Sequence, residues 1–169
     1  MNPALVMEAA IKTKFPIALA MALLSQESSG GHNEWGHDKT IFAAGQDKLH
    51  GKNWGDDPVT KQAYLAYKAE RATGGNQGVG PMQLTYPSYQ DAADKHGGAW
   101  KPLPNMVEGF SVVKHDVQRG GLRLGLASYN AGAKGAYTPA GQHYASSVLR
   151  LEADWARALG VPSLQNAGY

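Results

Sequence analysis

The sequence predicts a mainly helical fold (mainly α, of the α+β class) organised as one domain. Its 169 residues suit a single domain, since a domain commonly holds about 150 residues. Apolar residues recur at spacings of three and four in several segments, which is the period of a helix that buries one face. Hydrophobic residues make up 43% of the chain and charged residues 18%, enough apolar material for a core. We therefore expect one domain over residues 1–169.

Two helices are expected at the N-terminus. Asn2 and Pro3 are typical of a helix cap followed by the first helical residue, and they predict a helix to about Thr13. Pro16 begins a second helix, whose inward stripe is Phe15, Leu19, Ala22, Leu23 and Gln26. Glu27 follows this stripe, so a carboxylate lies in the last turn beside the buried face.

The rest of the chain predicts a long loop and then further helices. Residues 28–56 show no periodicity and predict a loop, and residues 78–84 predict a tight turn or short strand. Asp57 and Pro58 predict the start of a helix, and Ser163–Tyr169 is expected to fray. Helices are expected at about 57–71, 85–97, 104–119, 122–130 and 144–159, the last with the stripe Tyr144, Val148, Leu151, Trp155 and Leu159.

Composition restricts the chemistry. Cysteine is absent, which excludes disulfides, thiolate metal sites and cysteine nucleophiles. The net charge of +2 comes from scattered basic residues and gives no support to nucleic-acid binding. The apolar run 15–24 is too short for a membrane span, which needs about 18 residues, and it continues into polar residues. We expect no membrane insertion and no cleaved signal peptide.

Glu27 is the first catalytic candidate. A carboxylate at the end of an apolar helix is desolvated, which raises its pKa and suits a general acid. The alternative is an ordinary helix-end glutamate that points into water.

Four motifs in order give the chain a family resemblance. They are ESSG at 27–30, GVGPMQ at 78–83, ASYNAG at 127–132 and, on a later helix, Tyr144. Together they resemble motifs of the lysozyme-like superfamily of soluble lytic transglycosylases and goose-type lysozymes. The resemblance implies a lysozyme-like helical lobe with a groove for the glycan strands of peptidoglycan. The GVGPMQ form looks like that of phage lysins.

The resemblance also implies roles for individual residues. Glu27 would protonate the leaving glycosidic oxygen, with Tyr144 approaching its carboxyl group. The substrate-binding residues would be Ser28, Met82, Gln83, Tyr129, Asn130 and Tyr144. Structural alternatives are a core role for Met82, a turn amide for Gln83 and a helix cap for Asn130.

The sequence departs from the family pattern in two places. Gln83 lies farther from Glu27 than is usual, so we expect an insertion at about 31–77 that forms a wall or lid of the groove. Pro81 stands where leucine or isoleucine is usual.

A second carboxylate would decide the reaction. An inverting hydrolase needs one to activate water, whereas a lytic transglycosylase uses a single acid/base and the C6 hydroxyl of the substrate. Goose-type lysozymes carry one aspartate after a Trp-Gly pair, which Asp38 matches in WGHD at 35–38. Thr85 stands where they carry another. Asp38 is the second catalytic candidate, its alternative being an Asx-turn, and Asp56 in WGD at 54–56 is a rival that a helix cap explains.

Other chemistries have weaker support. His32, Glu34, His37, Asp38 and His50 cluster in one segment without the spacing of a zinc motif. Serines 25, 28 and 29 lack the context of a serine nucleophile. We expect no metal and no cofactor.

The leading hypothesis is a peptidoglycan glycosidase that cleaves the β-1,4 bond between N-acetylmuramic acid and N-acetylglucosamine, with hydrolysis favoured. The alternatives are a lytic transglycosylase that leaves 1,6-anhydro ends, or a non-catalytic peptidoglycan-binding or phage structural module. We expect a monomer that acts on the bacterial cell wall as a phage endolysin, delivered by a holin or a virion.

Overall fold

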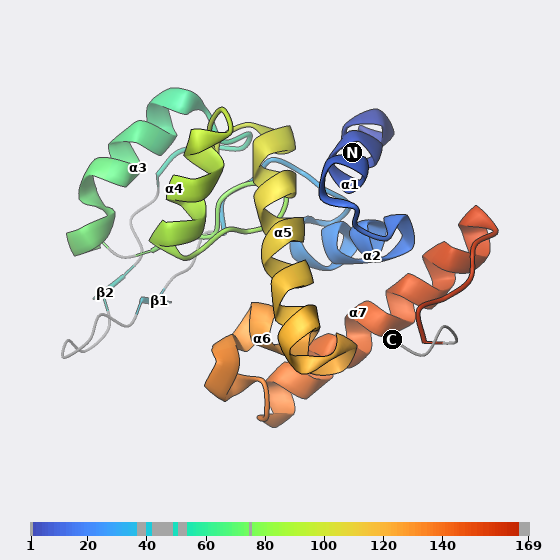
Figure 1. Cartoon of the computed structure of the whole chain (residues 1–169). Coiled ribbons are helices and arrows are strands. Elements are labelled where there is room, and N and C mark those ends of the chain that lie inside the picture. The colour runs from blue at the N-terminus through green and yellow to red at the C-terminus, as the bar shows by residue number, and fades with distance from the viewer. Residues whose placement is uncertain (1, 37–39, 42–48, 51–53, 75, 166–169) are drawn as a thin grey trace.

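Helices make up about two thirds of the described chain. The computed structural model describes residues 2–36, 40–41, 49–50, 54–74 and 76–165 (Figure 1). Its elements are α1 (Pro3–Thr13), α2 (Ile17–Ser28), β1 (Thr40–Ile41), β2 (Leu49–His50), α3 (Lys61–Gly74), α4 (Pro87–Lys95), α5 (Pro102–Gly120), α6 (Leu122–Gly135) and α7 (Pro139–Leu159). The two strands pair antiparallel, with Thr40 opposite His50. None of the described helices has both the length and the hydrophobicity needed to cross a membrane.

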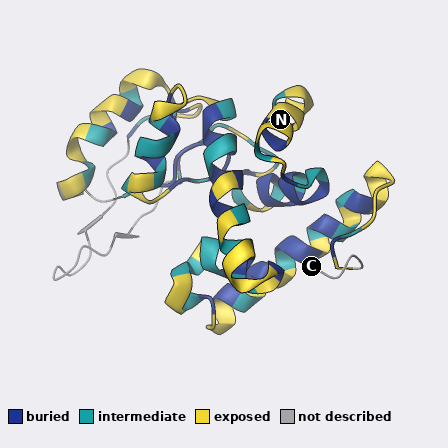
Figure 2. Ribbon diagram, in the orientation of Figure 1, coloured by how far each residue is buried: buried dark blue, intermediate teal, exposed yellow. Residues whose placement is uncertain are grey.

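Helix α5 is the central element (Figure 1). Helices α3 and α4 lie on one side of it, and α1, α2 and α7 lie on the other. Helix α2 is buried on most of its faces (Figure 2), with Leu19, Leu23 and Leu24 almost without exposed surface. Phe15, before α2, stacks on Phe110 of α5 with ring centroids 4.9 Å apart. The apolar run 15–24 is therefore part of the core.

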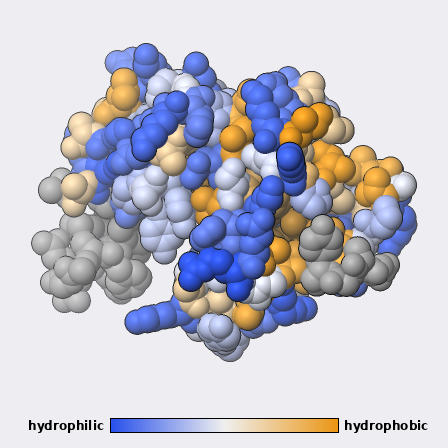
Figure 3. Space-filling view, viewed as in Figure 1, coloured by the Kyte–Doolittle hydropathy of each residue, from blue (hydrophilic) through white to orange (hydrophobic). Residues whose placement is uncertain are grey.

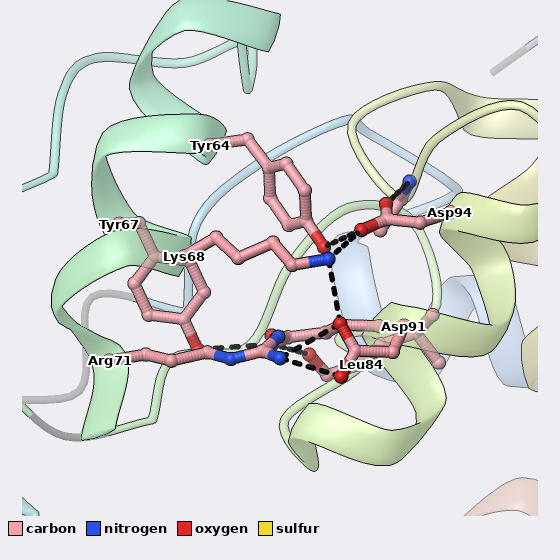
Figure 4. Close-up of polar contacts among 9 residues, drawn as sticks. Tyr64, Tyr67, Lys68, Arg71, Leu84, Asp91 and Asp94 are labelled. Atoms are coloured by element: carbon pink, nitrogen blue, oxygen red, sulfur yellow. Dashed lines mark hydrogen bonds and ion pairs between the residues drawn. The ribbon is translucent and has the colours of Figure 1, made fainter.

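Helix α3, which lies in the segment expected to be an insertion, is attached to α4 by a polar cluster (Figure 4). Arg71 donates to Gln90 Oε1 at 2.7 Å and to both carboxylate oxygens of Asp91 at 2.7 and 2.8 Å. Lys68 contacts Asp91 and Asp94 at 2.7 and 2.6 Å. We call these five residues the α3–α4 clamp.

The predicted starts of α3 and α5 were wrong by a few residues. Helix α3 begins at Lys61 rather than at Asp57, because the Thr60 hydroxyl accepts from Ala63 N and the Val59 amide bonds to Asn33. Helix α5 begins two residues before the predicted start, at Pro102.

The two C-terminal helices also differ from the prediction. Helix α6 runs on to Gly135 past a kink at Gly132, and α7 begins at Pro139, well before Tyr144. The predicted stripe of α7 holds for Tyr144 and Val148, but Leu159 is 42% exposed.

The segment after α7 is fixed where fraying was expected. Glu152 is fully buried, and its carboxylate accepts from the Ser163 hydroxyl at 2.7 Å and from Leu164 N at 3.0 Å. Gln165 donates to Leu149 O at 2.9 Å. These bonds fold the chain back on α7 as far as Gln165.

The surface is divided by polarity (Figure 3). The visible face is hydrophilic over α3 and α4, and hydrophobic residues gather on the side of α1 and α2. Met7 and Ile11 of α1 are exposed there by 47% and 69%.

Candidate active site

Glu27 lies where α2, the 78–84 turn, α6 and α7 meet. The hydroxyl of Tyr144, from the first turns of α7, donates a short hydrogen bond to Glu27 Oε1. The expected approach of these two side chains is thus confirmed. Burial raises the pKa of Glu27 from 4.5 to about 7, and the Tyr144 bond opposes part of that rise. Near neutral pH the carboxyl group therefore holds a proton that it can give away.

A pocket of about 330 Å³ opens beside this carboxyl group. Its walls come from four parts of the chain that are distant in sequence. Among the described residues that line it, Glu27 is the one with a carboxyl group. The lining residues are Glu27, Gly36, Gly78, Gln83, Leu84, Thr85, Tyr86, Tyr89, Tyr129 and Asn130. A concave site with a protonated acid and several hydrogen-bonding groups can bind and protonate a polar ligand.

Gln83 is placed by the backbone of the turn. It has a positive φ of 48°, and its amide donates to Gly80 O at 3.0 Å and to Glu34 O at 3.2 Å. The side-chain oxygen of Gln83, Oε1, lies so close to Gly78 that a Cβ atom on residue 78 would come within 2.4 Å of this oxygen. Gln83 lines the pocket as expected, but its NH₂ group also supports the turn.

Two expected substrate contacts are structural instead. Ser28 is 1% exposed, and its hydroxyl donates to Pro81 O at 2.7 Å and accepts from Gly31 N at 3.1 Å. Met82 is fully buried, with its side chain against Gly109 of α5. For Met82 this is the core role that the sequence left open as the alternative, and for Ser28 the expected substrate contact was wrong. Each side chain holds the turn against a neighbouring helix.

Tyr129 and Asn130 both line the pocket. The Tyr129 hydroxyl donates to Met82 O at 2.5 Å, which ties α6 to the turn. Burial, followed by the charge of Glu27, raises the pKa of Tyr129. The Tyr129 phenol therefore stays neutral. Of the two residues, Asn130 is the more exposed to solvent.

Asp38, the expected second carboxylate, lies outside the described residues, as does His37. Gly36, two residues before it, is in the pocket wall and its amide bonds to Gly78 O at 2.8 Å. The rival Trp54-Gly55-Asp56 match has a buried tryptophan and an exposed aspartate. The described part of the chain contains no group of three metal-binding side chains, and His50 has no described side chain.

Asn105 has a role that no sequence motif indicated. It is fully buried in α5, accepts from Met82 N at 2.9 Å and donates to Val79 O at 2.7 Å. Its side chain also fills the space beside Gly80, where a Cβ would come within 2.6 Å of it. A lone asparagine near a helix start gives no signal of this role, because the turn it supports lies more than twenty residues earlier in the sequence.

Comparisons with known proteins bear on the fold. No family model matches the chain, and no curated protein matches it. The structure is similar to the X-ray structure of an inactive mutant of the lytic transglycosylase Slt from Pseudomonas aeruginosa, with a TM-score of 0.57 and 15% identity. The match covers 95% of this chain and 25% of that one, so the chain spans about a quarter of the other's length. The likeness confirms the predicted mainly helical fold, which this chain shares with the matched part of that transglycosylase.

Proposed function

We propose that this chain cleaves the glycan strand of peptidoglycan, at the β-1,4 bond between N-acetylmuramic acid and N-acetylglucosamine. The observation that carries the proposal is the Glu27 carboxyl group, with a pKa of about 7, bonded to Tyr144 in the wall of a pocket. The motifs at 27–30, 78–83 and 127–132 support it, as does the likeness to a protein named a lytic transglycosylase.

Glu27 first acts as the acid. Its proton goes to the glycosidic oxygen, so the bond to the anomeric carbon breaks with a neutral leaving group. The carboxylate that remains is stabilised by the Tyr144 hydroxyl, whose hydrogen bond favours the charged form. Polar groups of Gln83 and Asn130 face the same pocket and are available to orient an acetamido sugar.

The first candidate is the route that uses one carboxylate. The Glu27 carboxylate next accepts the proton of the substrate's own C6 hydroxyl, whose oxygen attacks the anomeric carbon and closes a 1,6-anhydro ring. The route needs a single acid/base, which Glu27 can supply, and the likeness to a protein named a lytic transglycosylase supports it. We therefore propose a lytic transglycosylase.

Hydrolysis is the second candidate. It needs a carboxylate that activates water, about 6.5–9.5 Å from the acid in an inverting enzyme. The observation that favours it is Gly36, which lies in the pocket wall and precedes Asp38 by two residues in the sequence.

Cleavage of purified cell walls tests the proposal. The wild-type protein should clear a suspension of walls, and Glu27→Gln should reduce the rate by about 10²–10⁴-fold while it folds normally. Absence of clearing across several wall types would favour the non-catalytic module.

The products separate the two routes. Mass spectrometry should find wild-type ends that are lighter than hydrolysed ends by one water molecule, and Asp38→Asn should retain most of the rate. Reducing muramic acid ends, together with an inactive Asp38→Asn variant, would establish the hydrolase instead.

A further inference from the structure

A second groove adjoins the pocket of Glu27 and is larger than it. It has a volume of about 720 Å³, against about 330 Å³ for the pocket. One wall is a face of α5, and the others are the start of α4 and the end of α6. We call it the α5 groove.

The α5 groove is continuous with the pocket. Tyr86 and Tyr89 line both, and their rings meet edge to face with centroids 5.5 Å apart. The Tyr86 hydroxyl lies near Gly132 of α6, where a Cβ would be 3.5 Å away. These two rings therefore lie at the boundary between the pocket and the α5 groove.

The wall of the α5 groove carries charges of both signs. Glu108, Asp116 and Arg119 line it from the same helix, α5, with Glu108 more than two turns before Asp116. Among the described residues, Glu108 and Arg119 have no ion-pair partner, and Asp116 is 3.5 Å from the ring nitrogen of His115. Burial and the nearby charges of Asp116 and Glu108 raise the pKa of Tyr89, so these carboxylates act as far as the ring shared with the pocket.

We propose that the α5 groove binds the peptide stem that peptidoglycan carries on its muramic acid. This inference rests on the proposed function and adds a second part of the same substrate. A stem peptide that contains a diamino acid brings an ammonium group and a terminal carboxylate. Glu108 and Asp116 suit the ammonium group, and Arg119 suits the carboxylate.

The dimensions agree with this occupant. Glu108 and Arg119 are eleven residues apart in α5, which is roughly 16 Å along the helix axis. An extended stem of about four residues spans roughly 13 Å. Additional sugars would find the exposed rings of Tyr86 and Tyr137, 52% and 74% exposed, but a neutral sugar has no charges for Arg119 to pair with.

Binding of the free stem tests the inference without relying on catalysis. The probe is a tetrapeptide that contains a diamino acid, titrated into the full chain and followed by calorimetry. Arg119→Ala should weaken binding by about tenfold, and amidation of the peptide's terminal carboxylate should weaken wild-type binding by about the same factor. The amidated peptide should bind wild type and Arg119→Ala equally. Arg150→Ala, which removes an exposed arginine from α7, is the matched control and should bind as wild type does.

Cleavage then shows whether binding matters for the reaction. Wild type should cut peptide-bearing strands with a higher kcat/KM than strands stripped of their stems by an amidase. In Arg119→Ala the two kcat/KM values should be nearly equal. No binding of the tetrapeptide, or equal affinity in wild type and Arg119→Ala, would overturn the inference. So would chitin oligosaccharides that occupy the groove while the peptide does not. A chain that binds the peptide but cuts neither strand would overturn the proposed function and leave the groove assigned.

Discussion

Glu27 shows how one residue links burial to pH. Its folded pKa of about 7 lies above the ordinary value of 4.5, so between these values the folded state holds a proton that the unfolded state has lost. The resulting stabilisation is fully present below pH 4.5 and is lost as pH rises through 7. Proton donation is lost over the same upper range, so activity should fall above pH 7.

We predict that the unfolding free energy of wild type drops by roughly 3 kcal/mol between pH 5 and pH 8 relative to that of Glu27→Gln. The glutamine cannot ionise and so removes this pH dependence. Urea unfolding at both pH values measures it. Glu8→Gln, which changes an exposed carboxylate of α1 paired with Lys12, should keep the wild-type slope. Parallel slopes in wild type and Glu27→Gln would show that the carboxyl group ionises as easily in the folded state as in water.

Gln83 should be important for stability as well as for turnover. Its amide donates two hydrogen bonds to backbone carbonyls, so Gln83→Ala leaves two acceptors without their partner. We predict a loss of about 1–3 kcal/mol in unfolding free energy together with reduced activity. Thr85→Ala, at an exposed residue of the same pocket, should change stability by less than about 0.5 kcal/mol. An unchanged melting temperature with lost activity would mean that the amide acts mainly on substrate.

At the scale of elements, the α3–α4 clamp decides how firmly the inserted helix is held. The Arg71 side chain is 11% exposed and reaches both Gln90 and Asp91. Gln90 is fully buried and donates in turn to Leu84 O at 2.7 Å, in the turn that carries Gln83. Helix α3 therefore supports the turn at 78–84 through one side chain of α4.

We predict that Arg71→Ala lowers the unfolding free energy by about 1–2 kcal/mol, since Asp91 is partly exposed and its ion pair is screened. Hydrogen exchange should also speed up in α3 before it does in α5. Lys12→Ala, which breaks a surface pair within α1, is the control and should cost less than about 0.5 kcal/mol. Equal costs for the two substitutions would show that the clamp is no stronger than a surface ion pair.

At the scale of the whole molecule, the insertion shares the core of the helical body. Trp35, Trp54 and Tyr67 belong to the same hydrophobic cluster as Leu23 of α2 and Val148 of α7. The rings of both tryptophans meet Tyr67 edge to face, with centroids 5.5 and 5.3 Å apart. A continuous core favours unfolding as one unit.

We predict a single calorimetric transition whose calorimetric and van't Hoff enthalpies agree. This measurement also tests the expectation of one domain over residues 1–169. A separate transition at lower temperature, accompanied by loss of the α3 signal alone, would show that the insertion is an independent unit.

The sequence by itself determined most of the helices and the meeting of Glu27 with Tyr144. The cap residues Asn2 and Pro3 located α1, and periodic stripes located α2 and α5 closely, because a helix that buries one face repeats its apolar residues over several turns. Glu27 and Tyr144 were predicted to meet, and they do. Boundaries were less certain: Thr60 rather than Asp57 caps α3, since the residues just before the helix are held by Asn33.

Only the tertiary structure decided which way each motif residue faces. Ser28 and Met82 lie in motifs next to the pocket, yet one bonds to Pro81 and the other packs beneath Gly109. Asn105, Gln90 and Glu152 are fully buried polar residues that no local pattern indicated. The physical reason is that a buried polar group is stabilised by partners far along the chain, and those partners become neighbours only when the helices pack.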